Sequence, residues 1–301
     1  MYKCNVRPPH QGRMVGNSEI IVKFWPPLLA RVPGGRTSSK RKDSCRQWLC
    51  APCASGLAYN LTMRRRFFVE KFLGKTALME GEAAHHLGRV LRAQAGQLYE
   101  LSDGERVWLG RIETVGRDRV QFALVEELPG VHPRVEITLL LAVVKFDAFE
   151  WAIEKATELG VSTIVPLAAA RSEKSLVAAA ARRAERWKKI LLEASQQSRR
   201  LQIPVLGELA KPASAFASQK DGLRVMLSER TTASPLRSVL TGHRATKAVM
   251  ALGPEGGWTD EEFAVAQSFG FLEASLGHLI LRTETAVTAA LASLNYALDV
   301  E

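Results

Sequence analysis

Residues 249–262 read Val-Met-Ala-Leu-Gly-Pro-Glu-Gly-Gly-Trp-Thr-Asp-Glu-Glu, and this stretch decides the fold class of the region around it. The four apolar residues predict a buried strand that runs directly into a glycine-rich loop. Glycine permits positive φ and close approach of the backbone to a ligand, and Pro254 stiffens the turn. Thr259 and Glu262 have the spacing of a capping box. The stretch therefore predicts a strand, a loop fixed at both ends, and a helix.

The residues of this loop leave two interpretations open. It is either a tight turn without a ligand or a binding site, because glycine and proline suit both. The loop contains no lysine and no Gly-x-Gly-x-x-Gly pattern, so the phosphate-binding loops of nucleotide sites are not indicated. If the loop is a site, its sequence favours a ligand without phosphate.

From residue 135 onward, apolar strands alternate with helices. Strands are expected at 135–144, 161–167, 223–227, 248–252 and 271–276, and helices at 148–159 and 181–198 among others. This alternation predicts an α/β domain with a parallel sheet covered by helices on both faces. Ligands of such sheets bind beyond the carboxyl ends of the strands, so the loops at that edge are the candidates for a site.

A second candidate loop lies at 277–286, where Arg282 and Glu284 interrupt an otherwise apolar passage. The helix expected after it has an apolar stripe at Val287, Leu291, Leu294 and Leu298. Such a stripe suits helix packing, either within the core or across a dimer interface. The charged pair is either a structural ion pair or cap, or part of a functional site.

Residues 67–127 predict a different architecture, of short strands and one helix. The helix is expected at 82–92 and strands at 97–101, 106–114 and 120–125, separated by turns at 102–104 and 115–118. These spacings predict a small β-barrel of about 65 residues. The segment 128–133, which contains two prolines and a glycine, is interpreted as the linker to the α/β region.

Charge and cysteines are concentrated in residues 1–62. This segment holds ten of the 41 basic residues and two of the 31 acidic ones, so it carries +8 of the net charge of +10. It has no sustained periodicity, and we interpret it as a disordered basic extension, with Met63 as an alternative start. Cys45, Cys50 and Cys53 have a spacing used for metal ligands, but no fourth ligand is nearby, and we predict no metal site.

The rest of the chain contains no cysteine, which fits a reducing compartment. No apolar run approaches the roughly 20 residues of a membrane helix. We therefore expect a cytoplasmic protein without a membrane partner, whose RNA affinity would come from local basic patches.

Five short motifs follow one another along the chain. They are His85-His86-Leu87-Gly88-Arg89-Val90-Leu91-Arg92, Glu154-Lys155-Ala156-Thr157-Glu158-Leu159-Gly160-Val161, Gln197-Ser198-Arg199, Gly253-Pro254-Glu255-Gly256-Gly257 and Leu281-Arg282-Thr283-Glu284-Thr285-Ala286. With these motifs, the chain from residue 64 to its end resembles the 16S ribosomal RNA uridine-N3 methyltransferases, members of the SPOUT superfamily. It departs from that family at Leu279, where arginine is usual.

The resemblance implies a fold, a cofactor and partners. Residues 63–130 would form a PUA-like RNA-binding β-barrel, and residues 135–301 an α/β SPOUT methyltransferase domain tied in a trefoil knot. The cofactor would be S-adenosyl-L-methionine (SAM), and the substrate one uridine of 16S rRNA, free or in the small ribosomal subunit. The family also implies a homodimer.

The resemblance also implies roles for individual residues. SAM would be bound by Gly253, Pro254, Glu255, Gly256, Gly257, Leu276, Gly277, Leu281 and Thr285. The uridine N3 must lose a proton before it accepts a methyl group, so we assign Glu284 as proton acceptor and Arg282 as the cation that stabilises the anion. RNA contacts are expected at Arg64, Arg65, Arg66, Arg89, Arg92 and Arg199, whereas the basic run at 182–189 suits a solvated helix face as well as RNA.

Two rival functions remain open from the sequence. One is a non-catalytic RNA-binding or ribosome-assembly protein, although the glycines at 253, 256 and 257 argue against it. The other is a SPOUT enzyme that methylates a ribose 2′-hydroxyl or transfer RNA.

Overall fold

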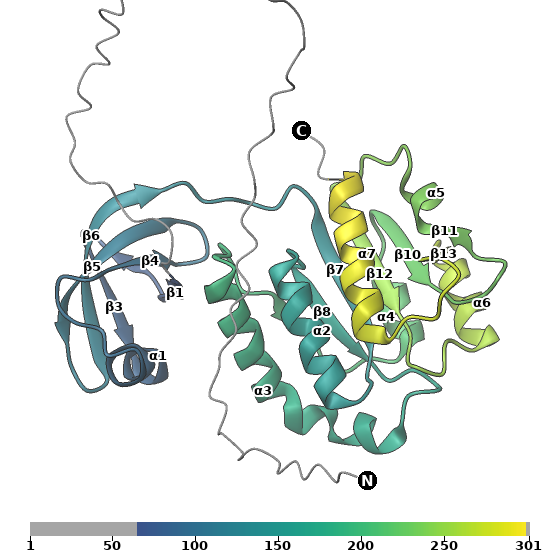
Figure 1. Cartoon of the computed structure of the whole chain (residues 1–301), viewed down its shortest axis with the longest axis horizontal. Helices are drawn as coiled ribbons and strands as arrows, with labels where there is room; N and C mark the ends of the chain where they lie inside the picture. Colours follow the sequence, from purple (N-terminus) through teal and green to yellow (C-terminus); the bar gives the residue numbers. More distant parts are fainter. Residues whose placement is uncertain (1–64, 299–301) are drawn as a thin grey trace, which may run out of the picture. The chain divides into compact units, whose positions relative to one another are not determined.

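The computed structural model describes residues 65–298, which form two β-sheets and their helices (Figure 1). The predictions for Arg64, for the cysteines and for the extension 1–62 lie outside these residues. Within the described range, no helix has the length and apolar character needed to span a membrane.

The first sheet has six strands in the order β1-β4-β5-β6-β3-β2. Their bounds are β1 Arg66–Phe68, β2 Phe72–Leu73, β3 Thr76–Glu80, β4 Leu98–Ser102, β5 Val107–Val115 and β6 Arg119–Leu128. Phe67, Leu101 and Phe122 form its buried core. Register shifts between β5 and β6 bend the sheet, and β1 and β2 end it as edges. The expected barrel is therefore a curled half-barrel that does not close.

The single regular helix expected at 82–92 is wrong in its geometry. Helix α1 (Gly81–His85) passes into a π-helix, η2 (His86–Val90), in which the Leu91 N–H donates to the His86 carbonyl at 3.1 Å. A π-helix has a wider turn than an α-helix. Leu87 is buried in this turn, while Val90, three residues later, is 62% exposed.

The second sheet has seven parallel strands in the order β11-β13-β10-β12-β7-β8-β9. Their bounds are β7 Glu136–Ala142, β8 Thr163–Leu167, β9 Val205–Leu206, β10 Leu223–Leu227, β11 Ser234–Pro235, β12 Lys247–Leu252 and β13 Leu272–Ser275. The predicted parallel sheet is thus confirmed. The five expected strands lie at its centre, and the two short strands β9 and β11 add its edges.

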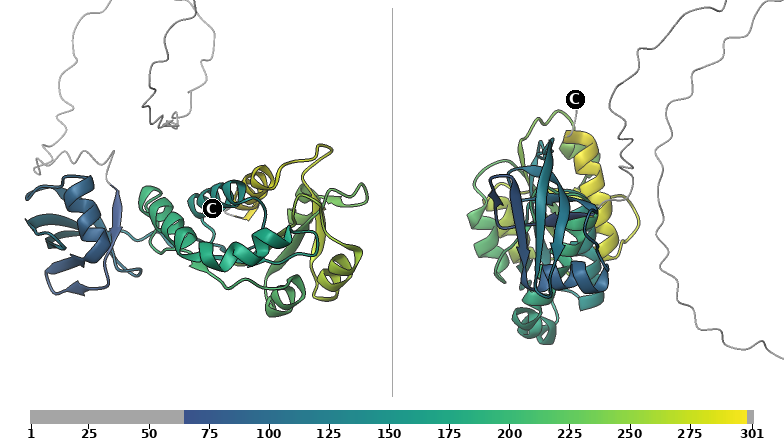
Figure 2. Two further views of the ribbon diagram at one scale, coloured as in Figure 1. Left: turned by 90° about the horizontal axis from the view of Figure 1, so that it is seen from below. Right: turned by 90° about the vertical axis from the view of Figure 1, so that its left-hand side faces the viewer.

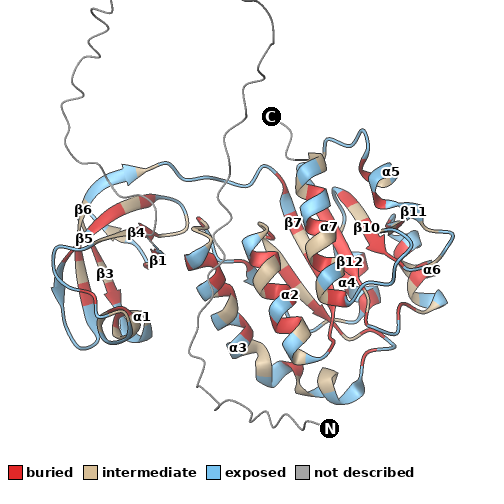
Figure 3. Ribbon diagram, in the orientation of Figure 1, coloured by how far each residue is buried: buried red, intermediate tan, exposed pale blue. Residues whose placement is uncertain are grey.

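Helices cover both faces of this sheet (Figures 2 and 3). One core lies under α2 (Phe146–Glu158), α3 (Lys174–Gln197), α5 (Leu236–Leu240) and α7 (Thr283–Leu298), and the other lies under α4 (Pro212–Ser218) and α6 (Asp260–Ser268). Leu139 and Leu141 enter the first core and Leu140 the second. Because helices cover both faces of the sheet, most residues of a central strand are buried and the strand has a nearly continuous apolar sequence.

The predicted capping box at the start of α6 is confirmed. The Glu262 N–H donates to the Thr259 hydroxyl at 3.2 Å, and the Thr259 N–H donates to the Glu262 carboxylate at 2.9 Å. The same carboxylate accepts a hydrogen bond from the Ala170 N–H at 2.9 Å. Helix α6 is therefore fixed to the loop that follows β8.

Replacing Thr259 with alanine should lower the free energy of unfolding by about 1 kcal/mol, because an N-cap side chain is lost. Urea denaturation followed by circular dichroism measures this change. Thr232→Ala, at an exposed turn, is the control and should leave stability nearly unchanged. Equal stability of the two variants would contradict the role of the cap.

Candidate active site

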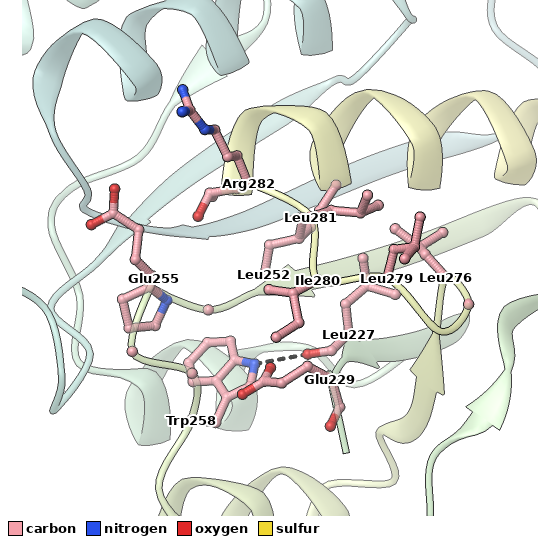
Figure 4. Close-up of a pocket in the computed structure, with 18 of the residues that line it drawn as sticks. Leu227, Glu229, Leu252, Glu255, Trp258, Leu276, Leu279, Ile280, Leu281 and Arg282 are labelled. Atoms are coloured by element: carbon pink, nitrogen blue, oxygen red, sulfur yellow. Dashed lines mark hydrogen bonds between the residues drawn. The ribbon is translucent and has the colours of Figure 1, made fainter. Parts of the chain in front are cut away.

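Three loops at one edge of the parallel sheet enclose a cavity of about 420 Å³ (Figure 4). They follow β10, β12 and β13, which are neighbours in the sheet, so their carboxyl ends meet. The lining residues are Leu227, Ser228, Glu229, Leu252, Gly253, Pro254, Glu255, Gly256, Gly257, Trp258, Leu276, Gly277, His278, Leu279, Ile280, Leu281, Arg282, Thr283 and Ala286. The volume lies in the range of small-molecule pockets, roughly 300–1,000 Å³.

The three glycines of the loop after β12 serve two different purposes. Only Gly257 has a positive φ, of 70°. A Cβ on Gly253 would lie 3.0 Å from the Trp258 ring, and one on Gly256 would lie 3.3 Å from the Arg171 Cβ. Positive φ is therefore needed at one position, while the other two are glycine because neighbouring side chains fill the space.

Hydrogen bonds hold this loop against its neighbours. The buried Trp258 ring donates from Nε1 to the Leu227 carbonyl at 3.0 Å, which joins the loop to the end of β10 (Figure 4). Arg171, in the loop after β8, donates from Nη1 to the Gly256 carbonyl at 2.8 Å. The Gly257 N–H closes a turn on the Pro254 carbonyl at 2.8 Å. The cavity wall is thus ordered by the protein itself.

The loop after β13 forms an apolar wall of the cavity. Leu279 and Ile280 line it and are 83% and 87% exposed. Exposed large apolar side chains at a cavity are typical of surfaces that a ligand or partner covers. The loop ends at Arg282, whose carbonyl accepts a hydrogen bond from the Ala286 N–H at 2.9 Å in the first turn of α7.

The charged side chains of the cavity lie at different ends of it. Arg282 and Glu255 lie toward one end, and Glu229 lies beside Trp258 (Figure 4). Glu284 does not line the cavity. It lies in the first turn of α7, where a carboxylate stabilises the positive end of the helix dipole.

Most of the predicted cofactor residues come together here. Eight of the nine line the cavity, and Thr285 does not, because its side chain is exposed on α7. The cavity is also lined by Leu227, Ser228, Glu229 and Trp258, which were not predicted from the sequence. Leu227 ends β10, and Ser228 and Glu229 follow it. No motif marks this strand, and only its position next to β12 brings these residues to the site.

Arg66, which was predicted from the sequence to contact RNA, is not a surface residue in the structure. Arg66 is buried, and its Nε and Nη2 atoms donate to the Glu100 carboxylate at 3.2 and 3.0 Å. Its Nη1 atom donates to the Arg199 carbonyl at 2.7 Å, and the Arg199 guanidinium lies 3.6 Å from Glu100. A buried carboxylate requires such partners, so this cluster has a structural explanation.

The other candidates for RNA contact differ in exposure. Arg65, Arg89 and Arg92 are exposed, whereas Arg199 is half-buried. In the basic run of α3, Arg183 and Arg186 bind Glu150 at 3.4 and 2.7 Å. Part of that run is therefore engaged in ion pairs within the domain.

Two family models match the chain. The RNA methyltransferase domain matches residues 131–295, and the RNA methyltransferase PUA domain matches residues 80–125. A relative from Synechocystis sp., described as ribosomal RNA small subunit methyltransferase E, is 33% identical over 237 residues, which are 76% of this chain and 76% of the relative.

Two solved structures are similar to the whole described region. A ribosomal RNA small subunit methyltransferase E from Neisseria gonorrhoeae, bound to S-adenosyl methionine, matches with a TM-score of 0.72 and 28% identity. A methyltransferase from Legionella pneumophila, in complex with the cofactor SAM, matches with a TM-score of 0.69 and 29% identity. Each match covers 78% of this chain and 98% of the solved chain.

Proposed function

Because the chain belongs to the family of ribosomal RNA small subunit methyltransferases E, it is a SAM-dependent rRNA methyltransferase of the SPOUT type, and we propose that it methylates N3 of one uridine in 16S rRNA. The observation that supports this proposal most directly is the cavity between the loops after β10, β12 and β13. This cavity is lined by the backbone of glycines, by apolar side chains and by Arg282.

The residues of the cavity fit the methyl donor. Gly253, Gly256 and Gly257 line the cavity and expose backbone rather than side chains to it. Trp258 and Ile280 provide apolar surface for a nucleoside base. When bound, SAM supplies an activated methyl group on a positively charged sulfur. The residues of the chain must then exclude water from that group and orient the uridine toward it.

We assign to Arg282 the stabilisation of the uridine anion. Its side chain lines the cavity, and a guanidinium placed where negative charge develops lowers the barrier. Glu284 is the proposed proton acceptor, although it does not line the cavity.

Glu284→Gln separates that role from a structural one. Loss of an acceptor should lower the rate of methyl transfer with unchanged stability, measured by single-turnover assays and urea denaturation. A role at the start of α7 should instead lower stability by about 0.3–1 kcal/mol and leave the rate nearly unchanged. The second result would remove Glu284 from the mechanism.

The proposal includes partners and domain roles. Residues 63–130 would bind RNA through Arg65, Arg89 and Arg92, and residues 135–301 would carry the knot and the chemistry. The chain would act as a homodimer in the cytoplasm, where its ribosomal substrate is assembled. The apolar residues Leu279 and Tyr296, both highly exposed, are consistent with a covered face in such a dimer.

Mass mapping of rRNA from a strain without the gene tests the function. We expect loss of one methyl group from the base of a single uridine in 16S rRNA, restored when the gene is returned. Loss of a ribose methyl group or of a tRNA methyl group would favour the other SPOUT activities. Unchanged RNA, together with no binding of SAM in calorimetry, would favour the non-catalytic protein.

A further inference from the structure

Glu229 occupies a place in the cavity that depends on Gly257. A Cβ added to Gly257 would overlap with a carboxylate oxygen of Glu229. The Glu229 carboxylate therefore occupies space that a side chain at position 257 would need. Glu229 lines the cavity and lies beside the Trp258 ring (Figure 4). Because Gly257 has no side chain, the Glu229 carboxylate from the loop after β10 can lie against the loop after β12.

The residues on either side of Glu229 are anchored. The Ser228 N–H donates to the Ala274 carbonyl at 2.9 Å, and the Ser228 hydroxyl accepts from the Arg230 N–H at 3.0 Å. The Arg230 guanidinium binds the Asp260 carboxylate and stacks 3.7 Å over the Phe263 ring. Because both neighbours are held, the backbone of Glu229 is fixed at the edge of the cavity before any ligand binds.

The Glu229 carboxylate itself is not used by these anchors. Within residues 65–298 the Glu229 carboxylate has no hydrogen-bond or ion-pair partner, and Glu229 is exposed where it lines the cavity. The other carboxylate of the cavity, Glu255, lies at the end that holds Arg282 (Figure 4). A ligand that covers Glu229 without offering donors would pay for its desolvation. The cavity therefore selects a ligand that presents hydrogen-bond donors at this point.

The proposed methyl donor offers two sets of donors, the ribose hydroxyls and the ammonium group of its amino-acid part. Glu229 lies beside the aromatic ring and the apolar ends of β10 and β12, surfaces that suit the nucleoside half. A carboxylate binds vicinal ribose hydroxyls through its two oxygens in dinucleotide sites, and the same chemistry is available here. Building on the proposed function, we infer that Glu229 is a cofactor-binding residue that accepts hydrogen bonds from the ribose hydroxyls of SAM.

Calorimetry with two ligands tests this inference on the full chain. The ligands are SAM and 5′-methylthioadenosine, which keeps the adenosine half and lacks the amino-acid part and the positive charge. Glu229→Ala should weaken binding of both ligands by the same factor, roughly tenfold or more, since hydrogen bonds to a charged group are lost. Glu229→Gln keeps one acceptor oxygen and should show a smaller loss.

Glu208→Ala, an exposed carboxylate after β9 that lies outside the cavity, is the matched control and should not change the affinity for either ligand. Thermal unfolding without ligand should be the same for all variants, because Glu229 has no hydrogen-bond or ion-pair partner in the described part of the chain. If Glu229→Ala weakens the binding of SAM only, the carboxylate contacts the amino-acid part of SAM and the ribose assignment is overturned. Unchanged affinity for both ligands also overturns it. Failure of the unaltered protein to bind SAM would contradict the proposed function instead.

Discussion

Replacement of Arg282 by alanine should lower the rate of methyl transfer by about 10²–10³-fold while SAM binding stays within about twofold. The guanidinium lies at the end of the cavity opposite the ring of Trp258, and it precedes α7. Its proposed partner is negative charge that develops on the uridine, which is absent before reaction. An interaction made only in the transition state changes the rate and leaves ground-state binding alone.

Single-turnover transfer to small ribosomal subunits measures the rate, and calorimetry measures the affinity for SAM. Arg282→Lys should restore part of the rate, because it keeps the charge but not the planar fork. Arg244→Ala, an exposed arginine that precedes β12, is the control and should transfer at the normal rate. If Arg282→Ala lowers SAM affinity as much as it lowers the rate, or if lost stability explains the lower rate, Arg282 has a structural role instead.

Replacement of Gly257 by alanine should weaken SAM binding by more than about 100-fold. Its φ of 70° is strained for any residue with a side chain, at a cost of about 1–2 kcal/mol. In addition, the new Cβ would displace the Glu229 carboxylate and disturb the turn closed on the Pro254 carbonyl. Strain and displacement act at the same place, so the loss should exceed that of Glu229→Ala.

Gly160→Ala separates these two causes. Gly160 has a φ of 91°, and no atom lies within 4 Å of an added Cβ. This variant should lose stability from strain but keep its affinity for SAM. Both variants are compared by urea denaturation and by calorimetry. If Gly257→Ala binds SAM as well as Gly160→Ala does, the loop does not form the donor site.

Features that depend on neighbours in the chain could be predicted from the sequence alone. The buried strand before Gly253, the capping box of Thr259 and Glu262, and the parallel sheet all follow from local patterns, and the structure confirms them. Strand β10 has the expected bounds, Leu223–Leu227. The second candidate loop also lines the cavity, since it too follows a strand at the same edge of the sheet.

Which polar residues share a site depends on contacts between distant parts of the chain and could not be predicted from the sequence. Arg66 and Glu100 are 34 positions apart, and Arg171 and Gly256 are 85 apart, so no periodicity could pair them. Glu229 reaches the cavity because β10 lies next to β12 and because Gly257 leaves space for its carboxylate. Hydrophobic spacing reports which face of an element is buried. Where a charge lies depends on which strands become neighbours, and that is fixed only when the whole sheet has formed.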